Sequence, residues 1–248
     1  MMLKFFRTIR KNLLEQGKTA NYLKYAIGEI VLVVIGILIA LQINNWNESR
    51  KNRAYELTML EEVHKELVKD LELIERLIPS LKRSQHSFRK LAVMKTDPGH
   101  NLDSLDFHLQ RVDGYGLTFT VNKSPFEAIK SGGLDRISNQ EIRNNLSTLF
   151  GFHIESAEKW INEVHRVELF TRDEIFYEIF DPVAIPNDNG GVTTKLTIEN
   201  PSLLFKNPKF DEFLFRSSWP ISNTIHFLSR IHEQMEILSE QIAQELNK

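Results

Sequence analysis

The chain has 248 residues, of which 42% are hydrophobic and 26% charged, an ordinary globular balance with enough apolar side chains for a core. It has no cysteine, which excludes disulfide bonds, thiolate metal sites and cysteine nucleophiles. Residues 1–24 hold six basic residues and one acidic residue, which leaves 25 basic and 32 acidic residues for the rest, and this acidic remainder without a basic stripe argues against nucleic acid as a partner.

The basic N-terminal segment, residues 1–24, is predicted to be a short amphipathic helix on the cytoplasmic leaflet of a membrane. In KFFRTIRKNLL the apolar side chains share one helical face: Phe5, Phe6, Ile9 and Leu13. Four basic side chains lie elsewhere on this helix and are expected to meet anionic lipid: Lys4, Arg7, Arg10 and Lys11. The alternative is a plain basic flank that only fixes the membrane topology.

The stretch GEIVLVVIGILIALQINNWNE, Gly28 to Glu48, fits a membrane span, a signal peptide or a buried core helix. We favour an uncleaved transmembrane helix at residues 25–46, because Glu29 and Gln42 lie close to its ends and no small-x-small cleavage site follows. Three aromatic residues occupy the positions of interface anchors: Tyr22, Tyr25 and Trp46. The excess of Lys and Arg before the span predicts an inner-membrane protein with a cytoplasmic N-terminus and residues 47–248 in the periplasm.

One face of this span carries residues spaced alternately four and three apart, the spacing of a helix-association seam. They are Glu29, Val33, Gly36, Ala40 and Ile43. Gly36 and Ala40 form a small-xxx-small pair, which lets helices approach closely, so we expect a homo-oligomer or association with another inner-membrane protein. The alternative function is a subunit of an inner-membrane transport or channel complex with Glu29 in the pathway, because an acid that faces lipid is costly.

Beyond the span, apolar spacing predicts a long amphipathic helix from Leu60 to Thr96, with Pro79 kinking or interrupting it. Its interleaved acidic and basic residues, Asp70 among them, are interpreted as a solvated face. The segment GYGLTFTV, residues 114–121, is predicted to be an extended connector.

Two capping boxes, at Ser124 and Ser138, predict a short helix that ends at Gly132-Gly133 and a long helix that reaches Phe180. Asp181 to Asn200 is rich in Pro, Asn and Gly and is interpreted as a mobile loop. A short Phe-rich helix and, after Trp219-Pro220, a last amphipathic helix complete the chain. The predicted fold class is mainly α: a transmembrane helix that continues into an extracytoplasmic antiparallel helical bundle with short extended connectors.

No catalytic or metal-binding constellation is recognised. The eight histidines are scattered without HExxH or an i, i+4 pair, so each is interpreted as a surface or rim residue rather than a metal ligand. We therefore expect no cofactor and no enzymatic activity. The predicted function is a membrane-anchored periplasmic interaction, scaffold or sensing module.

Residues 3–53, from KFFRTIRKNLL through GEIVLVVIGILIALQINNWNE to the basic exit, closely resemble the N-terminus of a family of uncharacterised single-pass membrane proteins of Bacteroidota. A second stretch, SPFEAIKSGGLDRISNQEIRNNLSTLF at Ser124 to Phe150, resembles that family's second recurring patch. The resemblance implies an inner-membrane protein with an extracytoplasmic helical domain. It implies no activity and no functional residues.

Overall fold

The computed structural model describes residues 19–97, 103–112, 117–198 and 200–248. It is mainly helical, with a long apolar helix toward the N-terminus and one small antiparallel sheet, so the mainly helical class is confirmed. The chain divides into two compact units, Met1–Glu56 and Leu57–Lys248. The second unit is called the helical domain below.

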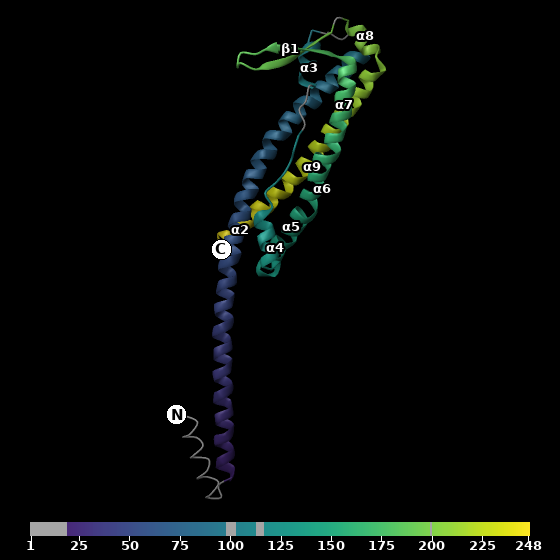
Figure 1. Ribbon diagram of the computed structural model, residues 1–248. Helices are drawn as coiled ribbons and strands as arrows, with labels where there is room; N and C mark the ends of the chain where they lie inside the picture. The colour runs from purple at the N-terminus through teal and green to yellow at the C-terminus, as the bar shows by residue number, and fades with distance from the viewer. Residues whose placement is uncertain (1–18, 98–102, 113–116, 199) are drawn as a thin grey trace. The chain divides into compact units, whose positions relative to one another are not determined.

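Figure 1 shows the described elements in chain order. The α-helices are α2 (Thr19–Thr96), α3 (Leu105–Val112), α4 (Ser124–Gly132), α5 (Gln140–Thr148), α6 (Ile154–Lys159), α7 (Arg166–Ile179), α8 (Pro201–Lys206) and α9 (Pro208–Leu246). The strands are β1 (Asp181–Pro186) and β2 (Val192–Thr197). A 3-10 turn, η1 (Leu134–Arg136), follows α4, and two π-helical segments, η2 (Leu149–His153) and η3 (Trp160–His165), join α5, α6 and α7 into one run of helix.

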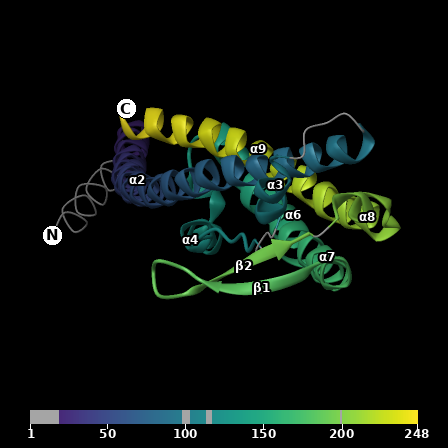
Figure 2. The same cartoon turned by 90° about the horizontal axis from the view of Figure 1, so that it is seen from above.

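In the helical domain, residues 57–96 of α2 lie beside α9 and run antiparallel to it (Figures 1 and 2). Four side-chain contacts define this register: Lys95 with Asp211, Gln85 with Ser222, Glu75 with His232, and His64 with Ser239. As the residue number rises along α2, the number of its partner on α9 falls. These contacts fix the two helices against each other along most of their shared length.

Neither internal proline ends its helix. Pro79 lies inside α2, so of the predicted kink or interruption only the interruption is excluded. Pro220 lies inside α9, so the predicted separate helix before Pro220 is wrong. A proline removes one backbone hydrogen bond, but packing on both sides of it can hold the helix together. Pro220 is itself buried, between buried Ser217 and Ile221.

Two hydrophobic cores fill the helical domain. The first joins α2, α4, α5, α6 and α9, and its fully buried members include Leu67, Ile142 and Met235. The second is rich in aromatic side chains, with Phe210 and Phe213 fully buried against α2, α7 and the hairpin. Helices α2 and α9 are both amphipathic, and the apolar face of each helix contributes side chains to both cores.

The described part of the predicted connector, residues 117–121, forms neither helix nor strand and is held by side chains of the α5–α7 run. The backbone N–H of Phe119 donates to Asn162 Oδ1 at 2.9 Å, and Asn162 Nδ2 donates to the Phe119 carbonyl at 2.7 Å. The N–H of Val121 donates to Glu158 Oε1 at 3.1 Å, and Lys123 Nζ donates to Glu158 Oε2 at 2.6 Å. Side chains thereby satisfy backbone groups that a neighbouring strand would otherwise satisfy.

The segment predicted to be a mobile loop, 181–200, forms a β-hairpin instead. Asp181 pairs with Thr197 and Pro186 with Val192. Asn187 donates its N–H to the Gly191 carbonyl at 2.9 Å, so this pair closes a loop of three residues, 188–190. Gly190 adopts φ +77°, the left-handed conformation that the last residue of such a loop needs. In this register Pro182 and Pro186 occupy positions whose missing N–H would point away from β2, so they do not disturb the pairing.

The helix starts differ in detail from the predicted capping boxes. Asn139, not Ser138, caps α5, because its Oδ1 accepts the N–H groups of Glu141 and Ile142. At α4 the capping position is Lys123, without a side-chain cap. Gly133, with φ +100°, ends α4 where the Gly-Gly pair predicts it.

Candidate functional site

The first unit contains an apolar stretch on α2 whose large side chains are exposed. Its most apolar 18-residue window has a mean hydropathy of 2.6 and no buried residue, and by length and composition this is the one described helix that could cross a membrane. Large side chains from Ile30 to Ile43 are about half exposed or more. A continuous apolar surface of this size has no stabilising contact in water and is typical of a surface that meets lipid or another protein.

The predicted seam residues form one stripe on this helix. At 100° per residue, the five positions from Glu29 to Ile43 fall within about 80° of arc. Val33 and Ile43 are exposed, and a Cβ added at Gly36 would meet nothing within 4 Å. The middle of the stripe, Gly36 and Ala40, therefore offers a shallow strip without bulky side chains, against which a second helix can pack closely.

The aromatic residue at the far end of the stretch, Trp46, is exposed, and the Arg50 guanidinium lies 5.6 Å from its ring centroid. A cation above an exposed indole suits the polar boundary of a bilayer. The side chains of Tyr22 and Tyr25 lie outside the described part of the chain, as do four whole residues: Lys4, Arg7, Arg10 and Lys11.

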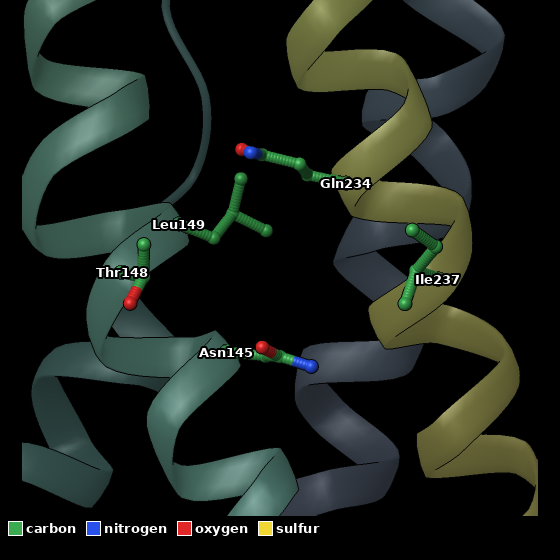
Figure 3. Close-up of a pocket in the computed structure, with 5 residues that line it drawn as sticks. All are labelled: Asn145, Thr148, Leu149, Gln234 and Ile237. Atoms are coloured by element: carbon green, nitrogen blue, oxygen red, sulfur yellow. The ribbon is translucent and has the colours of Figure 1, made fainter.

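The helical domain contains a cavity of about 220 Å³ between the α5–η2 junction and α9 (Figure 3). We call it the α5–α9 cavity. Its lining residues are Asn145, Thr148, Leu149, Gln234 and Ile237. Beside it, Asn145 Nδ2 donates to Gln241 Oε1 at 2.7 Å, which ties α5 to α9. None of the five lining side chains is charged.

A second cavity, of about 340 Å³, lies between the base of the hairpin and α8. Its polar lining includes the amides of Asn200 and Asn207, which cap helices: Asn200 Oδ1 accepts the Ser202 N–H, and Asn207 Oδ1 accepts the Lys209 N–H, each at 3.0 Å. Local backbone therefore already uses both amide oxygens, and the lining of this second cavity also includes Asp181.

Three buried titratable groups correct the sequence interpretation. His108, predicted at the surface, is 6% exposed, and burial lowers the pKa of its imidazole. Asp70, predicted on a solvated face, is 8% exposed, and burial, followed by the charge of Glu66, raises the pKa of its carboxyl to about 6. His165, predicted at the surface, is 3% exposed; burial, with repulsion by Arg172, lowers the pKa of its imidazole to about 4. Its Nδ1 lies 2.8 Å from Thr224 Oγ1, so the neutral ring is part of the contact between η3 and α9.

The sequence gives no signal for the burial of these groups, because each also has a partner from a distant segment. Asp70 interacts with Glu158 on α6, and the hydroxyl near His165 comes from α9. Among the described residues, no three His, Asp or Glu side chains lie where they could hold a metal ion together.

Residues 29–96 match a family of unknown function, DUF6090. The match begins at Glu29, takes in the exposed apolar stretch and ends with α2. It confirms that this part of the chain is similar to an uncharacterised family. Searches of curated proteins and of solved structures found no match to the chain.

Proposed function

We propose that the chain is a single-span inner-membrane protein whose helical domain lies in the periplasm and acts as an interaction, scaffold or sensing module by binding rather than by catalysis. The observation that carries the proposal is the apolar stretch of α2, which is long enough for a span and has no buried residue in its most apolar window. The resemblance of residues 3–53 to single-pass membrane proteins of Bacteroidota supports the same location.

The orientation follows from charge. Six Lys and Arg residues precede the span, while Arg50, Lys51 and Arg53 follow it closely, and the larger basic excess favours the cytoplasmic side. Alkaline phosphatase fused after Lys248 tests this orientation, because the enzyme is active only when exported. We expect activity from the C-terminal fusion in membranes, and an intact mass that retains the span. An inactive fusion, or a chain cleaved after the apolar stretch, contradicts the proposal.

We propose further that the span self-associates through the stripe of Gly36 and Ala40. The chain has no native cysteine, so single-cysteine variants report one position each. Oxidation of Gly36→Cys and Ala40→Cys in membranes is expected to give disulfide-linked dimers. Leu38→Cys is the matched control, since it lies about 200° around the helix from position 36.

The cross-linking pattern distinguishes this seam from random encounter. Dimers at positions 36 and 40 with little at position 38 support a specific interface. Equal cross-linking at all three positions contradicts it, and so does none at any position. Mass photometry of the full-length chain in mild detergent reads the resulting stoichiometry independently.

A further inference from the structure

The α5–α9 cavity has the features of a small-molecule site. Its volume is about 220 Å³, several times the space that a single water molecule needs. Leu149 and Ile237 supply an apolar wall, and Asn145, Thr148 and Gln234 supply polar groups from both flanking helices. Ligand sites commonly combine apolar walls with a few convergent polar groups.

Gln234 carries the first specific observation. Its Oε1 is buried and has no hydrogen-bond partner among the described atoms. Figure 3 shows the amide end of this side chain extending from α9 toward the α5–η2 junction, above Leu149. A buried carbonyl oxygen without a donor costs free energy, so this position favours an occupant that brings an N–H or O–H group.

The π-helical segment η2 is the second observation. It begins at Leu149, which lines the cavity, and Thr148 immediately precedes it. A π-helical turn is rare, and such turns occur frequently at functional sites. Here the change of helical period lies at the wall of the cavity, on the side opposite Gln234.

We propose that the α5–α9 cavity binds a small neutral molecule through an amide group. The ligand amide N–H donates to Gln234 Oε1, and its small apolar substituent rests on Leu149 and Ile237. A neutral ligand is favoured because the cavity has no charged lining residue, and an ion would lose its hydration without a counter-charge. The side-chain amides of Gln234 and Asn145 each offer a donor and an acceptor, the same pair that a ligand amide presents.

An amide of this kind occurs in acetamido sugars and in short peptides, and the test separates the two sources. The proposal goes beyond the membrane-anchored module of the previous section, because the cavity lies wholly within the helical domain. A negative result for one proposal therefore does not contradict the other. Cysteine cross-linking measures association of the span alone, and ligand binding measures occupation of the cavity alone.

The experiment is ligand-observed saturation-transfer NMR on the full-length chain in detergent micelles. The probes are N-acetyl-D-glucosamine, N-acetyl-L-alanine amide and, as the probe without an amide, D-glucose. Gln234→Leu removes the acceptor, and Gln244→Leu makes the same change at an exposed position of α9 outside the cavity. Ile237→Trp is a second variant that enlarges a lining side chain and leaves Gln234 in place.

We expect saturation transfer to at least one amide probe and not to D-glucose. Gln234→Leu should weaken binding roughly tenfold, the effect of losing a hydrogen bond at the upper end of its usual strength. Ile237→Trp should weaken binding by taking up ligand space, while Gln244→Leu leaves binding unchanged. A sugar-only or peptide-only signal assigns the source of the amide. No signal from either amide probe, an equal signal from D-glucose, or binding that survives both cavity variants overturns the proposal.

Discussion

Replacing Asp70 with asparagine is expected to stabilise the helical domain at neutral pH. Asp70 is buried on α2, and its Oδ2 has no hydrogen-bond partner among the described atoms. Burial is the main cause that raises the pKa of its carboxyl from 3.8 to about 6; Glu66 and Glu158 add to the rise and Lys69 opposes it. The folded state therefore disfavours the carboxylate, and asparagine keeps the shape without the charge.

The size and sign of the effect follow from proton linkage. A rise of about two pKa units at about 1.4 kcal/mol each corresponds to about 3 kcal/mol. Because the folded form binds this proton more tightly, the cost is fully present above pH 6 and disappears as the pH falls toward 3.8. The advantage of Asp70→Asn should therefore reach about 3 kcal/mol at pH 7.5, less a constant cost for the new amide, and shrink toward pH 4.

The wild-type pH profile alone cannot test this reasoning, because His165 acts in the same window with the opposite sign. The unfolded histidine binds a proton near pH 6.5, whereas the pKa of buried His165 is about 4. Its contribution to stability is fully present above pH 6.5 and is lost as the pH falls through this window. The two groups nearly cancel in the wild type, so the informative quantity is the difference between variant and wild type at each pH.

Urea unfolding of the full-length chain in mild detergent measures that difference. Tryptophan fluorescence reports the helical domain, since the rings of Trp160 and Trp219 contact each other at 5.3 Å between centroids. The control is Glu72→Gln, an exposed acid on the same helix, for which we expect a change within about 0.5 kcal/mol. A difference between Asp70→Asn and wild type that stays constant from pH 7.5 to 4.5 would refute the burial argument.

Three further substitutions test the contacts that hold the helical domain. His165→Leu leaves the Thr224 hydroxyl without its partner and should cost about 1–3 kcal/mol at pH 7.5 in urea unfolding; the loss should shrink toward pH 4.5, and a pH-independent loss would contradict it. Asn162→Leu removes both hydrogen bonds to Phe119 and should cost about 2 kcal/mol, with faster hydrogen exchange at the Phe119 amide; unchanged exchange would mean that another group holds the connector. Gly190→Ala forces a side chain into a left-handed conformation and should destabilise the hairpin by about 1 kcal/mol, seen as faster exchange of its amides and not of those in α9.

Local signals predicted the long helices well, because their periodicity and their end signals act over a few residues. The end of α2 at Thr96 and the end of α4 at the Gly-Gly pair both follow from such signals. The hairpin was missed because Pro182 and Pro186 are ordinarily strand breakers, and only the pairing register places them where an N–H is not needed. Register depends on contacts between strands, which a linear pattern does not contain.

The candidate sites, too, were predictable from the sequence only where they lie on one helix. The apolar stretch and its stripe lie on one helix, so spacing alone located Gly36 and Ala40. The α5–α9 cavity brings Asn145 and Gln234 together from segments that are distant in the sequence, and neither residue carries a local signal. Asp70 belongs by spacing to a charged face, but it is buried and interacts with Glu158 of α6. The periodicity of the sequence does not reveal polar groups that distant segments bury.

The two proposals together decide which kind of module the helical domain is. A scaffold needs the seam at Gly36 and Ala40 but no ligand, whereas a sensor needs a binding site whose occupation changes the association of the span. The decisive comparison is the rate of cysteine cross-linking at position 36 with and without a saturating amide probe. Coupling requires that the ligand bind the associated and separated forms with different affinity. An unchanged rate with proven occupancy assigns the domain to scaffolding, and a changed rate that disappears in Gln234→Leu assigns it to sensing.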